Sequence, residues 1–159
     1  MSVAKRLKEY LEQNHVPYSH CTHRMAYTAQ EVAATQHVPG QNMAKTVVLK
    51  ADDQYVMVVL PAPLKLDLEM LRRELPFGRL ELASEKDLAW LFMDSELGAM
   101  PPLGNLYNPP VFVDQSLAVR EEIVFNAGTH MDTIQMRYDD FERLVHPKVI
   151  HAAFATTCG

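Results

Sequence analysis

Two apolar stretches rich in valine and leucine, at residues 43–50 and 54–62, dominate the hydrophobic pattern of the chain. Three residues, Ala51-Asp52-Asp53, separate them, which is a spacing typical of a β-hairpin. Both stretches are apolar at consecutive rather than alternate positions, so each strand is expected to be covered on both faces. The pattern therefore predicts a hairpin in the interior of a sheet.

Helical and strand patterns surround this hairpin. Residues 3–14 carry apolar side chains at helical spacing, and Thr28-Ala-Gln-Glu31 is a capping-box pattern that opens a helix ending before Pro39. Further helices are predicted at 67–75, 84–93 and 138–145, and further strands at 16–22, 79–82, 110–114, 122–127 and 133–137. Because helices and strands do not alternate regularly, we expect an α+β fold with a mixed, curled, barrel-like sheet flanked by helices. Residues 1–150 are assigned to one domain, and residues 151–159 to a C-terminal tail that is expected to fray.

Composition and charge narrow the class of protein. The chain has 159 residues, of which 48% are hydrophobic and 22% charged, as in soluble globular domains. A net charge of −5 argues against a protein that coats DNA or long RNA, although one or two cations are enough to grip the last nucleotides of an RNA. The two cysteines form no disulfide or metal pattern, and no segment has the features of a signal peptide or a membrane span. We therefore expect a cytoplasmic protein.

One lysine interrupts an apolar strand face. Lys45 shares a face of the first long strand with Met43, Val47 and Leu49. A lysine on a face directed at the core is costly unless its ammonium reaches water, a cleft or an anion. Lys45 is therefore either a strand-end residue whose ammonium extends to solvent or part of a binding site.

The segment 98–110 predicts a long, ordered loop. It contains four prolines and two glycines in 13 residues, a composition that excludes a helix or a central strand. Its start, Gly98-Ala-Met-Pro-Pro102, is a stiff turn whose backbone N–H groups could bind a developing oxyanion. The alternative is a rigid connection between a helix and a strand.

Histidine-containing segments supply the remaining candidates. Asn126-Ala-Gly-Thr-His130 places polar side chains around a glycine at a strand end, where a histidine can belong to a site or be structural. His20 and His23 suggest a metal, but in a strand they point to opposite faces. The sequence lacks the G-x-S-x-G, Walker A, G-x-G-x-x-G and H-E-x-x-H patterns, so neither an activated serine nor a zinc-bound water is indicated.

Five short motifs together resemble the YbaK family, which includes the inserted editing domain of bacterial prolyl-tRNA synthetases and related free-standing deacylases. The motifs are residues 44–49, Leu60-Pro61-Ala62, the loop 98–104, the strand 110–114 and the glycine turn 125–129. They occur in the order and at the spacing of the family, and the resemblance runs from about the first helix to His146.

This resemblance implies hydrolysis of the ester in a wrongly charged aminoacyl-tRNA, with no metal, no cofactor and no covalent intermediate. The partners it implies are the acceptor end of a tRNA and, in addition, an aminoacyl-tRNA synthetase, but neither DNA nor a membrane. Lys45 would hold the terminal adenosine or its phosphate, and backbone N–H groups of Gly98, Ala99 and Met100 would bind the oxyanion. The residues expected to contact the substrate are Cys21, Thr22, Pro102, Asn126, Gly128, Thr129 and His130. Lys45 and the turn at Gly98 would then open onto one common hollow.

The sequence departs from one branch of the family at positions that line the amino-acid pocket. Cys21 or Thr22 stands where that branch has an aromatic residue, and Thr133, beside Asp132, where it has an acidic residue. His130 differs as well. Because apolar pockets discriminate by only about 1–3 kcal/mol per methylene, the amino acid stays open.

Two other functions remain open at this point. The same pocket could hold a nucleotide or an aminoacyl-tRNA without turnover and regulate a synthetase. Alternatively, a metal-dependent hydrolase could use His20, His23 or His130 as ligands.

Overall fold

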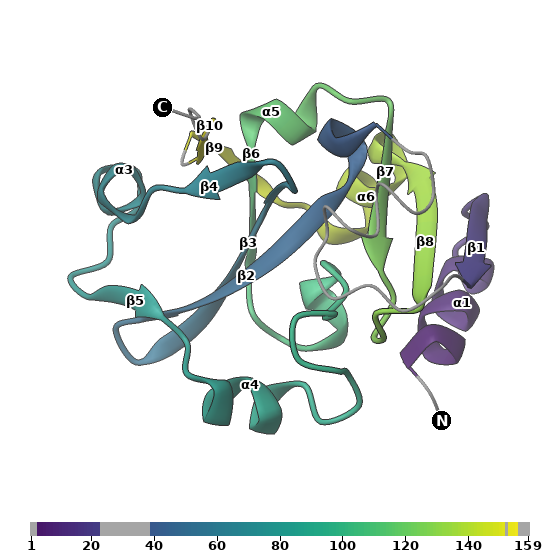
Figure 1. The fold of residues 1–159 in the computed structure, drawn as a ribbon, viewed down its shortest axis with the longest axis horizontal. Helices are drawn as coiled ribbons and strands as arrows, with labels where there is room; N and C mark the ends of the chain where they lie inside the picture. The colour runs from purple at the N-terminus through teal and green to yellow at the C-terminus, as the bar shows by residue number, and fades with distance from the viewer. Residues whose placement is uncertain (1–2, 23–38, 152, 156–159) are drawn as a thin grey trace.

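A long antiparallel hairpin forms the centre of the molecule. The structure, a computed structural model, describes residues 3–22, 39–151 and 153–155 of the chain. β2 (Ala44–Ala51) and β3 (Gln54–Pro61) pair along their whole length, and Asp52 takes a positive φ of 53° in the turn between them. β5 (Leu80–Leu82) extends the sheet beyond β2, while β6 (Val111–Asp114) and β9 (Lys148–Ile150) extend it in parallel beyond β3. The prediction of an interior hairpin is therefore confirmed (Figure 1).

The apolar side chains of this sheet alternate between two cores. On one face, Val48 and Val59 join the larger core, which includes side chains of α1 and α6. On the other face, Leu49 and Val58 join the smaller core, which includes Leu71 of α3. The helices of the described chain are α1 (Val3–Gln13), α3 (Leu68–Glu74), α4 (Glu85–Leu91), α5 (Gln115–Ala118) and α6 (Tyr138–Val145). Burial on both faces explains why the two central strands are apolar at consecutive positions.

A second, three-stranded sheet lies beside the start of β2. β8 (Asp132–Arg137) pairs antiparallel with both β1 (Tyr18–Thr22) and β7 (Glu122–Asn126). A single parallel bridge, between Met43 and Val124, joins this sheet to the central one. Figure 1 shows β2 and β7 starting close together and then diverging, with β1 and α1 at the far side of the smaller sheet.

Short elements complete the fold. β4 (Leu64–Leu66) and β10 (Ala153–Ala155) form a two-stranded ribbon, and 3-10 turns occupy η1 (Gly40–Asn42) and η2 (Gly104–Leu106). Asp67 caps α3, and Ser84 caps α4 in a capping box with Asp87. No helix within the described ranges is both long enough and apolar enough to span a lipid bilayer.

The expected α+β class with mixed sheets is confirmed, with three corrections of detail. The described strands form three sheets rather than one closed barrel. β4, α5, β9 and β10, each of three or four residues, were not predicted. Residues 153–155, which were assigned to the tail, form a strand that pairs with β4. The helix predicted from Thr28 lies outside the described residues.

Candidate functional site

A row of polar side chains crosses the three-stranded sheet on the face directed away from the larger core. Thr133 pairs directly with Cys21 on one side and with Asn126 on the other. Directly paired residues project to the same face of a sheet, so the three side chains form a row. Their neighbours Phe125 and Ile134 project to the opposite face, into the larger core. Cys21 is an exposed free thiol, whereas Asn126 and Thr133 are buried.

Lys45 extends this row onto the central sheet. The bridge between Met43 and Val124 sets β2 and β7 in parallel register at their starts. Lys45 and Asn126 each follow a bridge residue by two positions, so alternation directs both side chains to the same face. Three of the residues predicted from the sequence, Cys21, Lys45 and Asn126, therefore project to one face, together with Thr133.

The ammonium of Lys45 is held at the end of the hairpin. Its Nζ donates hydrogen bonds to the carbonyl oxygens of Ala62, at 3.1 Å, and Leu64, at 2.5 Å. An ammonium has three N–H donors, and the described part of the chain engages two of them, so one remains for a ligand. Burial lowers the pKa of Lys45 below its ordinary value of 10.5, and the nearby charge of Lys65 lowers it further. Partial burial strengthens the field that a single cation exerts on an anion.

Asn126 offers an acceptor to the same face. Its side chain is only 6% exposed, and its Oδ1 has no hydrogen-bond partner within the described residues. An unsatisfied buried amide oxygen costs about 1–3 kcal/mol. A substrate ammonium or hydroxyl on this face would remove that cost by donating to it.

The turn at Gly98 is clamped to the turn between β7 and β8. Gly128 N–H donates to the carbonyl oxygen of Ala99 at 2.9 Å, and Glu96 N–H donates to that of Gly128 at 2.7 Å. His130 is buried, and its Nε2 lies 2.8 Å from the carbonyl oxygen of Leu97. Because a carbonyl only accepts, Nε2 carries the proton. Sequence segments thirty residues apart are therefore joined where β7 ends, next to Asn126.

Both glycines in this clamp have conformations that explain their identity. Gly98 has a φ of 84° and Gly128 a φ of 94°, a region that residues with a Cβ rarely adopt. A Cβ on Gly98 would also lie 3.5 Å from Cε1 of His130. His130 therefore packs over the turn at Gly98, whereas the sequence had suggested a contact with substrate.

The expected set of oxyanion donors is smaller than predicted. Ala99 N–H donates to the carbonyl oxygen of Glu96 at 3.0 Å, so it is already engaged. Pro102, like Pro101 before it, has no N–H and is buried. Within the described residues, the N–H groups of Gly98 and Met100 make no backbone hydrogen bond, and these two remain as candidate donors.

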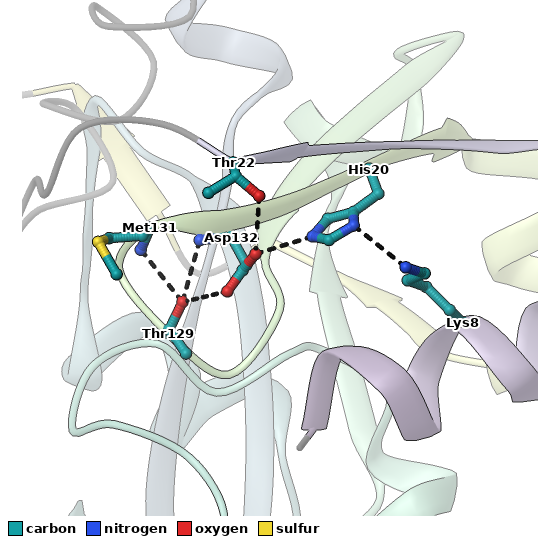
Figure 2. Close-up of polar contacts among 6 residues, drawn as sticks. All are labelled: Lys8, His20, Thr22, Thr129, Met131 and Asp132. Carbon is teal, nitrogen blue, oxygen red and sulfur yellow. Dashed lines mark hydrogen bonds and ion pairs between the residues drawn. The ribbon is translucent and has the colours of Figure 1, made fainter. Parts of the chain in front are cut away.

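Asp132 is the centre of a polar network on the other face of the small sheet (Figure 2). Its Oδ1 accepts from Thr22 Oγ1 at 3.2 Å and lies 2.8 Å from His20 Nε2, and its Oδ2 accepts from Thr129 Oγ1 at 2.7 Å. Burial would raise the pKa of Asp132, but the hydrogen bonds from Thr129, His20 and Thr22 together lower it. Lys8 Nζ lies 3.4 Å from His20 Nδ1; since an ammonium only donates, Nδ1 accepts and Nε2 donates to Asp132.

This network engages the hydroxyls of two residues that were predicted to contact the substrate. The hydroxyls of Thr22 and Thr129 bind Asp132 on the face opposite to Cys21 and Asn126, and Thr129 also accepts from the N–H groups of Met131 and Asp132. Both threonines therefore shape the turn instead of facing the row. Alternation along β1 and β8 was the signal that could have assigned Thr22 to one face and Thr133 to the other.

Lys45 and the Gly98 turn were expected to open onto one common hollow, and the cavities lined by described residues do not test this expectation. A cavity of about 250 Å³ contacts the Gly98 turn, and its lining includes Phe92, Leu97 and Met100 from α4 and the loop, but not Lys45. Nor do the described residues contain a cluster of three or more His, Cys, Asp or Glu arranged to hold a metal ion. His23, one of the three histidines considered for a metal, lies outside the described residues.

The fold is shared with solved structures of low sequence identity. A protein described as "a putative trans-editing enzyme for prolyl tRNA synthetase" is 20% identical and superimposes with a TM-score of 0.83, covering 98% of this chain and 99% of that one. A scaffold used for computational grafting of linear epitopes is 19% identical, with a TM-score of 0.82 and the same coverage. The hypothetical protein APE2540 is 17% identical, with a TM-score of 0.83 over 93% of this chain and 99% of that one. These likenesses establish the fold.

The sequence itself establishes the family. The model of the aminoacyl-tRNA editing domain matches residues 23–144, which include Lys45, the Gly98 turn, β7 and β8 but not β1. The chain belongs to the aminoacyl-tRNA editing domain family, as the motifs had indicated. No protein with a curated description matches the sequence significantly.

Proposed function

We propose that this chain is a free-standing deacylase of the YbaK type, which hydrolyses the ester bond of mischarged aminoacyl-tRNA in trans. The observation that carries the proposal is the arrangement of Lys45 and Asn126 on one sheet face, where β7 leads into the clamped turns of Gly98 and Gly128. The proposal assigns a cation, a buried acceptor and two backbone donors to a single substrate. They suit a substrate that combines a phosphate, an amino group and an ester carbonyl.

The role proposed for each group follows from its chemistry. The ammonium of Lys45 binds the terminal adenosine or its phosphate through the N–H that Ala62 and Leu64 leave unused. Oδ1 of Asn126 accepts from the ammonium or a hydroxyl of the esterified amino acid. The N–H groups of Gly98 and Met100 donate to the carbonyl oxygen as it becomes negatively charged.

An ester needs little more than positioning and charge stabilisation. One preorganised oxyanion donor is worth about 2.7–4 kcal/mol, and correct orientation contributes several kcal/mol more. The attacking water is oriented by backbone groups and by the substrate's own amine or hydroxyl. This reaction accounts for a site whose described residues include no activated serine.

Turnover of mischarged tRNA tests the proposal directly. We expect the wild-type chain to release free amino acid in molar excess over enzyme from at least one of alanyl-, seryl-, threonyl- and cysteinyl-tRNA. Lys45→Ala should abolish this release while the fold persists, because truncation removes the cation without opening the main core. Lys50→Ala is the matched control, since Lys50 is an exposed lysine on the same strand.

Two results would contradict the assignment. Stable binding of charged tRNA with no release of amino acid would identify a binding module that does not turn over its ligand. Equal rates for Lys45→Ala and wild type across the panel would remove Lys45 from the mechanism. A synthetase that is required for activity would appear as turnover only after its addition, which would support editing in trans by a complex.

A further inference from the structure

A two-stranded ribbon beside Lys45 presents a cation and an exposed aromatic ring. Lys65 of β4 lies directly opposite Phe154 of β10 in the antiparallel register. Directly opposite side chains share a face, with their Cβ atoms about 4.5–5.5 Å apart. Lys65 is exposed, and Phe154 is 44% exposed although it is aromatic. Neither residue has a part in the site described above.

The ribbon is attached to the ammonium of Lys45. Lys45 Nζ donates to the carbonyl oxygen of Leu64, the residue that precedes Lys65. The charge of Lys65 is near enough to lower the pKa of Lys45. Two cations held close together attract a polyanion, because an anion between them relieves their repulsion.

We propose that Lys65 and Phe154 form a docking platform for the unpaired 3′ end of tRNA, with Lys65 on a backbone phosphate and Phe154 stacked against a base. The inference rests on the proposed function, since it extends the site around Lys45 to the nucleotides that precede the ester. Sites for single-stranded nucleic acid combine cations that follow the backbone with aromatic side chains that stack on bases. The ribbon between β4 and β10 presents one of each on a single face. Stacking tolerates any base, so it suits a terminus that many tRNAs share.

The platform predicts a specific pattern of RNA binding. The probe is an RNA microhelix with an unpaired 3′ end that carries an amide-linked, non-hydrolysable amino acid. Its dissociation constant is measured by fluorescence anisotropy with the full chain at several salt concentrations. Phe154→Leu, which keeps an apolar side chain but removes the ring, should weaken binding by about five- to one-hundred-fold. Lys65→Gln should weaken binding and reduce the slope of log K against log salt by about 0.7, whereas Lys65→Arg should restore both.

Matched variants elsewhere on the surface serve as controls. Trp90→Leu removes an exposed ring from α4, and Lys86→Gln removes an exposed lysine from the same helix. Both should bind the microhelix as the wild type does. If Phe154→Leu does not fold, as circular dichroism would show, the salt slope of Lys65→Gln decides the matter alone.

The outcomes for the platform and for the proposed function can be told apart. Wild-type affinity and salt slope in both Lys65→Gln and Phe154→Leu would overturn the platform, even if mischarged tRNA is turned over. Failure of the wild type to bind the microhelix at all would overturn it as well. Binding that depends on both residues, without release of amino acid from any mischarged tRNA, would support the platform and refute the deacylase.

Discussion

Replacement of Gly98 by alanine tests the central turn of the site. Gly98 has a φ of 84°, and the turn is fixed by the hydrogen bond from Gly128 N–H to the carbonyl oxygen of Ala99. An L-residue in the left-handed region costs roughly 1–2 kcal/mol. The added Cβ would meet His130 Cε1 at 3.5 Å, an ordinary contact, so the backbone alone supplies the cost. We therefore expect Gly98→Ala to lose about 1–2 kcal/mol of unfolding free energy.

Gly40→Ala is a close control for this variant. A Cβ on Gly40 would meet Pro63 Cγ at 3.6 Å, nearly the same contact distance, but Gly40 does not have a positive φ. Alanine at such a position restricts the unfolded chain and should leave stability unchanged or raise it by up to about 1 kcal/mol. The comparison therefore separates backbone strain from crowding.

Thermal and urea denaturation measure the difference. For a chain of this size, each kcal/mol shifts the melting temperature by about 2–4 °C, so Gly98→Ala should melt about 2–8 °C below the wild type. Deacylation should fall as well, because a turn that relaxes to negative φ moves the N–H groups of Gly98 and Met100. Equal melting temperatures for Gly98→Ala and Gly40→Ala would refute the argument from strain.

Three further results are expected. Binding of the amide-linked analogue should fall at alkaline pH as Lys45 loses its proton, and the fall should begin below pH 10.5 because the pKa of Lys45 is lowered. Lys65→Gln should move this fall to higher pH, because it removes a charge that lowers the pKa of Lys45. A fall at the same pH in wild type and Lys65→Gln would show that Lys65 does not act on Lys45. Asp132→Asn should lower the melting temperature at neutral pH but not in strong acid. The pKa of Asp132 is lowered in the folded state, so its carboxylate stabilises the fold above pH 3.8, and this stabilisation is lost as the pH falls through the pKa of the folded state. The same difference in melting temperature at every pH would contradict this. Ser84→Ala should lower the free energy of unfolding, measured by urea denaturation, by about 1 kcal/mol, because Ser84 Oγ accepts from Asp87 N–H in the capping box. An unchanged free energy of unfolding would show that this cap does not contribute to global stability.

Local chemistry in the sequence was sufficient for the helix ends and the central hairpin. The capping box of Ser84 with Asp87 and the cap at Asp67 act over a few residues, so they can be identified without knowledge of the fold. The consecutive apolar positions of β2 and β3 likewise report burial on both faces. The role of glycine at residue 98 was recognisable in the same way, because the conformation it permits is a local property.

A site formed by residues on paired strands cannot be predicted in this way, because the register between the strands depends on segments far apart in the sequence. That Thr133 lies between Cys21 and Asn126 depends on how β8 pairs with β1 and β7. A shift of one residue would have exchanged Thr133 for Asp132 on that face. Sequence reasoning placed Thr22 with Cys21 in the pocket, whereas alternation within β1 sends the two side chains to opposite faces.

The sequence by itself therefore determined the class of fold, the family and the identity of the stiff, glycine-dependent turn, since these follow from short-range propensity and from motifs in a fixed order. Only the tertiary structure decided which polar side chains share a face with Lys45 and that Ala99 N–H is already engaged. Only the tertiary structure showed that Lys65 lies opposite Phe154, because β4 and β10 are three residues long and almost ninety residues apart in the chain. The energy of strand pairing comes from side chains on two strands, so it cannot be deduced from either segment of sequence alone.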